Sequence, residues 1–244
     1  MSVKGIYEIG ENRRIASGIY LMKLLGDNSA ITKPGQFVNI ALDGFYLRRP
    51  ISIFDVSEDG FSIIYKVVGE GTQAMSEYPV GTKLDILMGL GNGFDISKAG
   101  EMPLLIGGGC GCPPMYYLAK KLIEAGKTPV AILGFNSAED VICADELRAL
   151  GVEVTVTTVD GSVGTKGFVT NAFDGADFDY FFACGPEPML KAIAFATEMD
   201  GQLSFEARMA CGFGGCMGCT CRTKYGNKRI CVDGPVLLKE EVIW

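Results

Sequence analysis

Four cysteines near the end of this 244-residue chain have a spacing that can bind an iron–sulfur cluster. They form the pattern Cys-x4-Cys-x2-Cys-x11-Cys, whose members are Cys211, Cys216, Cys219 and Cys231. A Cys-x4-Cys-x2-Cys run followed by a distant fourth cysteine is typical of plant-type [2Fe–2S] sites. The glycines between the cysteines let backbone N–H groups approach the inorganic sulfur. A structural zinc site is the alternative, but such sites usually contain two close cysteine pairs. Cys221 is a spare thiol, because the spacing favours Cys219 as the third ligand.

A second pattern combines an arginine, a hydroxyl group and a glycine-rich turn. Arg49 begins the segment Arg-Pro-Ile-Ser, and Ile-Tyr-Lys and Gly-Glu-Gly-Thr segments follow it. Glycines before a helix N-terminus can bind a diphosphate through free N–H groups and the helix dipole. Arg49 can add a bidentate contact to the same diphosphate, although such an arginine taken alone is usually a solvated charge. The candidate binding residues are Arg49, Pro50, Ile51, Ser52, Ile64, Tyr65, Lys66, Gly71 and Thr72.

A third pattern predicts a dinucleotide site. Residues 107–114 read Gly-Gly-Gly-Cys-Gly-Cys-Pro-Pro and stand between an expected strand and an expected helix. Glycines there allow the backbone to approach a pyrophosphate, and the two prolines fit the first turn of a helix. A Cys-Gly-Pro turn after a later strand is its companion, with an ordinary core role for Cys184 as the alternative. The candidate residues are Gly107, Gly108, Gly109, Gly111, Cys184, Gly185 and Pro186.

The loop after the second strand of this region favours NAD over NADP. A 2′-phosphate usually requires an arginine or lysine at that place. Residues 134–140 contain no cation and two carboxylates, Glu139 and Asp140. These carboxylates would repel a 2′-phosphate.

Composition narrows the chemistry further. The chain has no histidine, which excludes Ser-His triads, Cys-His pairs, histidine metal sites and Rieske clusters. A bound cofactor must therefore supply the reactivity. The net charge of −7, with no basic run longer than a pair, argues against nucleic acid as a partner. The chain shows no signal-peptide core, and its longest charge-free stretch, 102–119, holds seven Gly or Pro residues. We expect a cytoplasmic protein without a membrane segment.

The elements that must position these residues change in type along the chain. Short β-favouring runs separated by turns predict an antiparallel sandwich or barrel, with strands at 19–25, 37–41, 51–55, 61–68 and 84–88. One short helix is expected at 73–78 with Thr72 as its N-cap. Alternating strands and helices then predict a parallel sheet, with strands at 103–106, 130–134, 152–158 and 180–184 and helices at 115–124, 144–149, 170–173 and 188–197.

The sequence after residue 205 is irregular and rich in glycine and cysteine. Five of the nine cysteines fall in the last 34 residues. The chain is therefore expected to combine an all-β and an α/β region with a small metal module. The expected domains are a β-barrel at 1–99, an α/β domain at 100–204 and a cluster module at 205–244.

The second and third patterns resemble the ferredoxin–NADP reductase superfamily, and the cysteine pattern follows them in the chain. Their order and the chain length resemble the electron-transfer subunits of dihydroorotate dehydrogenase B within it. The resemblance implies that the barrel binds FAD, with the Ser52 hydroxyl facing flavin N5 and Cys184 near the hydride path. Many members have an aromatic residue where this chain has Pro50-Ile51. The Tyr65 ring is expected to cover the flavin instead.

The resemblance also implies cofactors and a partner. The cofactors are FAD, a [2Fe–2S] cluster and NAD, and the partner is an FMN-containing catalytic subunit in a heterotetramer with two copies of each chain. Electrons would pass from dihydroorotate through FMN, the cluster and FAD to NAD, as part of pyrimidine biosynthesis. Two alternatives stay open at this point. One is the small subunit of another NADH-linked oxidoreductase of the ferredoxin or sulfide type, and the other is a redox-sensing module without turnover.

Overall fold

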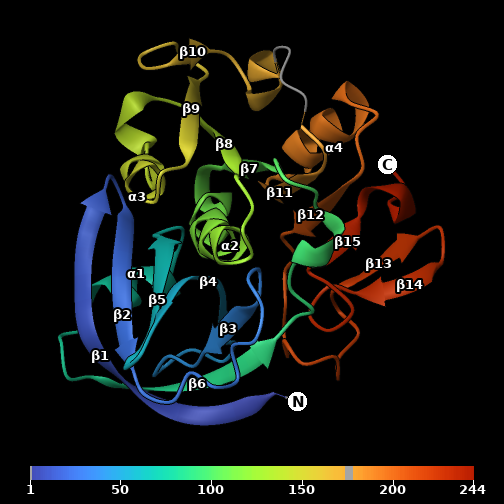
Figure 1. Cartoon of the computed structure of the whole chain (residues 1–244). Coiled ribbons are helices and arrows are strands. Elements are labelled where there is room, and N and C mark those ends of the chain that lie inside the picture. Colours follow the sequence, from blue (N-terminus) through green and yellow to red (C-terminus); the bar gives the residue numbers. More distant parts are fainter. Residues whose placement is uncertain (1, 174–177) are drawn as a thin grey trace.

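A closed six-stranded antiparallel barrel forms the N-terminal part of the protein. The computed structural model of the chain describes residues 2–173 and 178–244 (Figure 1). The barrel has the strand order β1-β2-β5-β4-β3-β6. Its strands are β1 (Val3–Ala16), β2 (Ile19–Leu25), β3 (Phe37–Ile40), β4 (Arg49–Ser57), β5 (Gly60–Lys66) and β6 (Lys83–Leu90). Closure of the sheet decides between the two predicted β architectures in favour of the barrel.

Two local expectations in the barrel need correction. The 14-residue β1 was not predicted as a strand, because its exposed polar stretch hides the alternation; pairing with both β2 and β6 holds it. Helix α1 (Glu70–Glu77) begins earlier than expected, with Gly69 as its N-cap. The predicted cap, Thr72, lies inside the first turn. Its hydroxyl oxygen accepts hydrogen bonds from the N–H groups of Val68 and Gly69, at 2.9 and 3.2 Å.

A seven-stranded sheet follows the barrel. Its order is β10-β9-β8-β7-β11-β12-β15. The parallel strands are β7 (Leu104–Gly108), β8 (Val130–Phe135), β9 (Glu153–Thr158), β10 (Thr165–Lys166), β11 (Phe181–Gly185) and β12 (Gly201–Phe205). The chain adds strands on one side of β7 as far as β10 and then continues on the other side of β7 with β11. Ligands of such sheets bind beside this switch point, at the carboxyl ends of the strands.

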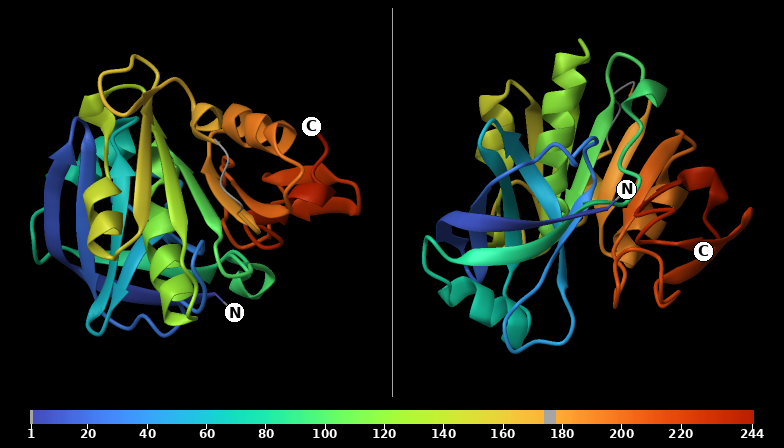
Figure 2. Two further views of the ribbon diagram at one scale, coloured as in Figure 1. Left: turned by 45° about the horizontal axis from the view of Figure 1, so that its top comes forward. Right: turned by 90° about the horizontal axis from the view of Figure 1, so that it is seen from below.

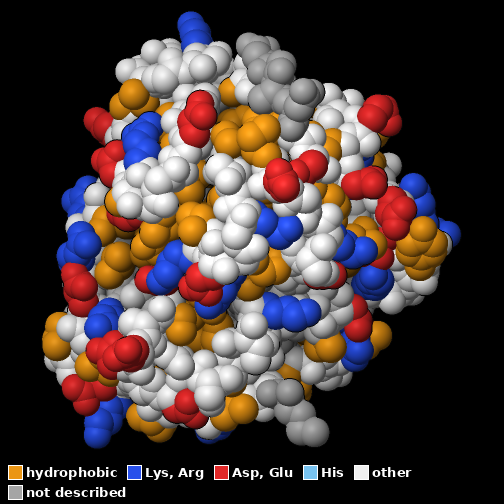
Figure 3. All heavy atoms as spheres, viewed as in Figure 1, with side chains coloured by type: hydrophobic (Ala, Val, Ile, Leu, Met, Phe, Trp, Pro, Cys, Tyr) orange, Lys and Arg blue, Asp and Glu red, His pale blue; other side chains and the backbone are white. Residues whose placement is uncertain are grey.

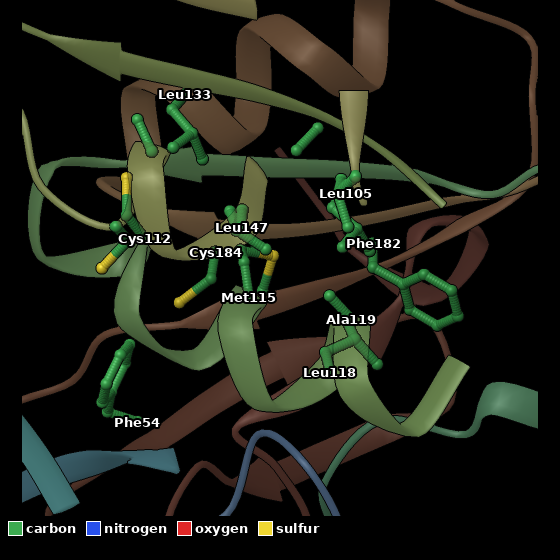
Figure 4. Close-up of a cluster of buried hydrophobic side chains, with 14 of the residues drawn as sticks. Phe54, Leu105, Cys112, Met115, Leu118, Ala119, Leu133, Leu147, Phe182 and Cys184 are labelled. Carbon is green, nitrogen blue, oxygen red and sulfur yellow. The ribbon is translucent and has the colours of Figure 1, made fainter. Parts of the chain in front are cut away.

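The helices of this part are α2 (Pro113–Glu124), α3 (Ala144–Ala149) and α4 (Glu187–Ala196). The short helix expected at 170–173 is a 3-10 turn, Val169–Ala172. Helix α2 covers a core that the barrel shares. Figure 4 shows Leu105, Met115, Leu118 and Phe182 of this cluster, with Phe54 of the barrel at its edge. The rings of Phe54 and Tyr116 stack with centroids 4.6 Å apart.

The C-terminal segment returns to the sheet. It forms a hairpin of β13 (Thr220–Thr223) and β14 (Gly226–Arg229), and then β15 (Val236–Leu238), which pairs antiparallel with β12. Figure 2 shows this red segment at the end of the sheet away from α3. The predicted boundary at 204/205 falls inside β12 and separates most of that strand from β15, its hydrogen-bonded neighbour. A strand of only three residues, such as β15, leaves little periodicity in the sequence.

The surface carries both signs of charge. On the face shown in Figure 3, acidic and basic side chains are interspersed, and hydrophobic side chains are visible between the barrel and the α/β part. None of the helices in the described residues is long and apolar enough to cross a membrane.

Candidate functional site: two dinucleotide pockets and a cysteine loop

Arg49 lies directly against the start of helix α1. A pocket of about 280 Å³ is lined by the glycine turn before α1, by Arg49 and by Phe45. The Arg49 guanidinium lies 5.0 Å from the centre of the Phe45 ring and donates to the carbonyl of Leu47. A Cβ on Gly71 would lie 2.3 Å from Arg49 Nη2, so only glycine leaves room for this arrangement. A guanidinium beside free N–H groups at a helix start is suited to bind a diphosphate.

Ser52 and Tyr65 differ in how the strands orient them. Ser52 is half-buried on β4 and pairs in register with Phe37 of β3. Tyr65 lies on β5 and is only 2% exposed. Its ring stacks on Tyr20 at 5.8 Å, and its hydroxyl donates to the Asn12 side chain at 2.9 Å. The expectation that the Tyr65 ring covers a flavin is therefore wrong, because the strand turns this side chain into the barrel core.

A larger pocket lies at the carboxyl ends of the parallel strands. It measures about 430 Å³ and is lined by the glycine-rich loop after β7, the Cys-Gly-Pro turn after β11, and the ends of β8 and β9. The two turns touch. A Cβ on Gly111 would lie 2.1 Å from the Cys184 carbonyl oxygen, and one on Gly108 would lie 2.4 Å from the Met189 sulfur. The structure thus brings together the two segments of the third sequence pattern at the switch point of the sheet.

Cys184 is a neutral thiol at this place. It is 4% exposed, and burial raises the pKa of its thiol to about 12, although a hydrogen bond with Ser204 lowers the pKa in part. Two further cysteines, Cys112 and Cys143, are also buried, and burial raises their thiol pKa values well above the usual range. At neutral pH the Cys184 side chain therefore presents a neutral S–H group rather than a thiolate.

The large pocket also contains a cation that the sequence analysis assigned to the flavin site instead. Lys66, at the end of barrel strand β5, lines the pocket together with Asp140. Lys66 Nζ lies 3.7 Å from Asp140 Oδ1. Among the described lining residues, Lys66 is the one cation and Asp140 the one carboxylate. The loop of residues 134–140 has no cation of its own, but the barrel supplies one, which reduces the repulsion of an anion by Asp140.

The four cysteines of the first pattern form two pairs. The first three lie in residues 211–219, which we call the cysteine loop, and Cys231 lies after the hairpin of β13 and β14. Cys211 and Cys216 are linked, since the Cys216 N–H donates to the Cys211 sulfur at 3.4 Å. Cys219 and Cys231 are linked in the same way, also at 3.4 Å. Burial alone would raise the pKa of the Cys211 thiol. Hydrogen bonds from the N–H groups of Cys216 and its neighbours stabilise the thiolate more strongly, so the pKa is lowered to about 6. The spare Cys221 lies in strand β13.

This paired arrangement fits a two-iron cluster better than a single ion. In the described residues, no three His, Cys, Asp or Glu side chains converge on one metal position. A [2Fe–2S] cluster needs two protein ligands on each of two irons, whereas structural zinc needs four around one ion. The N–H groups that point at the sulfurs are the donors that such a cluster uses. The donor set therefore fits an iron–sulfur cluster.

Comparison with known proteins decides the family. Residues 206–243 match the iron–sulfur cluster binding domain of dihydroorotate dehydrogenase B, and residues 105–194 match an oxidoreductase NAD-binding domain. A protein of Fusobacterium nucleatum named dihydroorotate dehydrogenase B (NAD(+)), electron transfer subunit, is 44% identical, with 96% of each chain covered. A Bacillus pumilus protein of the same name is 41% identical, with 98% of each chain covered. This chain belongs to that family of electron transfer subunits.

Solved structures agree with the family. The structure of an NADH-dependent reduced ferredoxin-NADP oxidoreductase, studied for flavin-based electron bifurcation, is 33% identical, has a TM-score of 0.89 and covers 98% of this chain and 90% of its own. A ferredoxin NADP+ reductase from Neisseria gonorrhoeae with bound FAD and NADP shares the fold at 16% identity, with a TM-score of 0.68 over 79% of this chain and 89% of its own.

These findings confirm several predictions. The family resemblance, the barrel and parallel-sheet architecture, the iron–sulfur domain and the NAD-binding domain are all confirmed. The chain is an oxidoreductase subunit that transfers electrons, and the family name implies a catalytic partner subunit. The individual binding residues, the domain bounds, the flavin of the partner and the subunit ratio stay predictions.

Proposed function

We propose that this chain carries electrons from an FMN-containing dihydroorotate dehydrogenase subunit to NAD by way of its cysteine loop and an FAD on its barrel. The observation that supports this order most directly is the neighbour relation of three barrel strands. Strand β4, with the Arg49–Ser52 segment, lies between β3 and β5. Asn39 of β3 contacts the loop of Cys211, and Lys66 of β5 lines the NAD pocket. A flavin on β4 therefore lies between the cluster and NAD.

The order also follows from what each group can exchange. NAD accepts a hydride, a [2Fe–2S] cluster passes single electrons, and FAD can exchange both, so FAD belongs between them. Arg49 and the turn around Gly71 hold the FAD diphosphate in this proposal. Ser52 directs its hydroxyl toward the flavin ring, Cys184 packs at the nicotinamide, and Lys66 contacts the dinucleotide in the large pocket.

An exposed apolar surface around the cysteine loop supports a partner subunit. Phe213 and Met217 lie within the loop and are each 55% exposed, and Val232 next to Cys231 is 39% exposed. Exposed apolar groups of this kind are typical of protein interfaces. A subunit that covers them would bring its FMN near the cluster and exclude water from the path. We propose a heterotetramer with two copies of each chain.

The chemistry of dihydroorotate belongs to the partner. The chain has no histidine to act as a base toward a carbon-bound proton. All nine cysteines are free, which fits the reducing cytoplasm that we infer for the complex.

The test compares the isolated chain with the complex. The isolated chain is expected to oxidise NADH with a dye but not to oxidise dihydroorotate, whereas the complex with the FMN subunit forms orotate and NADH together. Substitution Cys219→Ala should stop NAD reduction by dihydroorotate and leave most NADH-to-dye activity if FAD remains bound. The conservative control is Cys221→Ala, which removes the spare thiol of the same segment. Turnover of dihydroorotate by the isolated chain, or full NAD coupling without the cluster, would refute the proposal.

Co-purification separates this function from its rival. The 33% identical solved structure belongs to an NADH-dependent reduced ferredoxin-NADP oxidoreductase. If a large flavoprotein with further iron–sulfur clusters, rather than an FMN subunit, purifies with this chain, the ferredoxin-linked function replaces the one proposed. If neither partner is bound and NADH transfers no electrons to a dye, a redox-sensing role without turnover replaces both.

A further inference from the structure

Asn39 lies in the contact between the barrel and the cysteine loop. On β3, Val38 and Ile40 belong to the barrel core. Neighbouring residues of a strand point to opposite faces, so Phe37 and Asn39 share the outer face. Phe37 packs in a separate buried cluster that includes Cys231. The outer face of β3 is therefore covered by the C-terminal segment, and Asn39 is its polar residue.

The side-chain amide of Asn39 holds the peptide of the first cysteine. Its Nδ2 donates to the carbonyl oxygen of Cys211 at 3.2 Å, and Asn39 is 0% exposed. The next residue, Gly212, has φ +78, and a Cβ there would lie 2.4 Å from Asn39 Nδ2. The backbone at Gly212 therefore lies so close to the Asn39 side chain that only glycine fits there. The position of the Cys211 peptide depends on the Asn39 side chain.

The side-chain oxygen of Asn39, Oδ1, indicates why asparagine occupies this position. Asn39 Oδ1 has no hydrogen-bond partner in the part of the chain that the structure describes. A buried amide oxygen without a partner destabilises a protein, so an apolar side chain would suit a purely structural position better. Turning the amide over would set Oδ1 against the carbonyl of Cys211, where two acceptors repel each other. The N–H donor toward Cys211 is therefore the feature that requires asparagine.

Arg48 connects the backbone of Asn39 to the segment Arg49–Ser52, which we call the flavin segment. Its Nη1 donates to the carbonyl oxygens of Asn39 and Asp85, at 3.3 and 2.9 Å. Its Nη2 lies 2.9 Å from the Asp85 carboxylate. Arg48 directly precedes Arg49, and Pro50 of the same segment pairs in register with Asn39. Asn39 is thus connected through its backbone to the flavin segment and through its side chain to the cysteine loop.

We propose that Asn39 is a positioning residue that fixes the Cys211 loop relative to the flavin segment and thereby sets the rate of electron transfer between flavin and cluster. This inference rests on the proposed function, because it needs both groups to be bound. The rate depends on this placement, because electron transfer between two bound groups weakens steeply as the distance between them grows.

The test uses two variants and a matched control. Asn39→Asp keeps the size and shape of the side chain and removes the N–H donor; it is assayed at alkaline pH, where the buried carboxyl is ionised and has no O–H to donate. Asn39→Leu removes both polar groups. Gln36→Leu is the control. Gln36 is a buried amide next to β3 whose Nε2 donates to the Gly91 carbonyl at 3.2 Å and whose Oε1 accepts from the N–H groups of Thr32 and Lys33. Its side chain therefore bonds to the barrel rather than to any of the four cysteines. All three are prepared in the complex with the partner subunit.

Iron, acid-labile sulfide and NADH-to-dye activity should stay at the level of the unaltered complex in the Asn39 variants. Electron transfer from the NADH-reduced flavin to the cluster, followed by stopped flow, should be severalfold slower in both Asn39 variants than in Gln36→Leu and in the unaltered complex. The electron paramagnetic resonance spectrum of the reduced cluster should change in both Asn39 variants and not in Gln36→Leu.

The outcomes separate the inference from the function on which it rests. An unaltered transfer rate and spectrum in a cluster-loaded Asn39→Asp complex would overturn the positioning role and leave the relay intact. If Asn39→Leu does not fold, Asn39→Asp decides alone. Loss of the cluster from both variants would also overturn the role, because Asn39 would then serve assembly only. Absence of iron and sulfide from the unaltered protein would instead refute the proposed function.

Discussion

Substitution of Gly71 by alanine separates cofactor binding from protein stability. In a helix, alanine is more favourable than glycine by up to about 1 kcal/mol, so Gly71→Ala should not lower the melting temperature. The new Cβ would lie 2.3 to 2.6 Å from three atoms of the Arg49 guanidinium. Because this group is the end of a flexible side chain, it can move aside at little cost to the fold. The guanidinium then leaves the place from which it is proposed to contact the FAD diphosphate.

The size of the effect follows from the bond that is lost. A hydrogen bond to a charged group contributes about 1.5 to 3 kcal/mol, which corresponds to roughly 10- to 150-fold in Kd. We therefore expect the Kd of the apoprotein for FAD to rise within that range, while Tm stays constant or rises. Titration of flavin-free protein with FAD gives the Kd, and thermal unfolding of the same samples gives Tm.

A double-mutant cycle with Arg49→Ala tests the reasoning. If the alanine at position 71 acts by displacing the guanidinium, it should weaken FAD binding only while Arg49 is present, so that the two effects are not additive. An equal loss in the Arg49→Ala background would show that the Cβ acts on the cofactor directly. Unchanged FAD affinity in Gly71→Ala would remove the proposed role of Arg49.

Four further predictions concern the other sites. Cys216→Ala should remove iron and acid-labile sulfide while leaving FAD bound; zinc without sulfide in anaerobically prepared protein would contradict the cluster. Lys66→Gln should raise the Kd for NADH more than Lys120→Gln does, because Lys120 pairs with Asp55 of the barrel outside the pocket, and equal effects would count against a nucleotide contact. Reduction of the flavin, followed by stopped flow, should be faster with NADH than with NADPH. Asp140→Asn should make the two rates more similar, because it removes a carboxylate that would repel the 2′-phosphate. Because burial raises the pKa of Cys184 to about 12, its alkylation in the folded protein should be slow at neutral pH and accelerate only as the pH approaches that value.

Much of the secondary structure is encoded locally. Strand β2 and helix α3 have the predicted bounds: β2 is a β-favouring run between Gly18 and Gly26, and α3 is a short helical run that ends before Gly151. The long β1 and the short β15 were missed because their stability comes from distant partners. Strand β1 pairs with strands on both sides, and β15 pairs with β12, more than 30 residues earlier in the chain. Pairing between distant segments leaves no periodic signal in either one.

The sequence by itself determined the kinds of chemistry available to this protein. Cysteine spacing predicts the cluster, glycine-rich turns after strands predict dinucleotide binding, and the absence of histidine excludes most other catalytic groups. These features are readable because each depends on residues close together in the chain. A loop that wraps a cluster or a diphosphate must carry its ligands and glycines within one short segment.

Only the tertiary structure decided which segments meet. Barrel closure turned Tyr65 into the core and brought Lys66 to the large pocket, although the two residues are adjacent. It also placed Asn39 against Cys211, 172 residues away. The physical reason is that side chains on a strand alternate between faces, while the register and the packing of one sheet on another decide what each face meets. The relative positions of the Arg49–Ser52 segment, the four cysteines and the large pocket are therefore a property of the packed protein rather than of any motif.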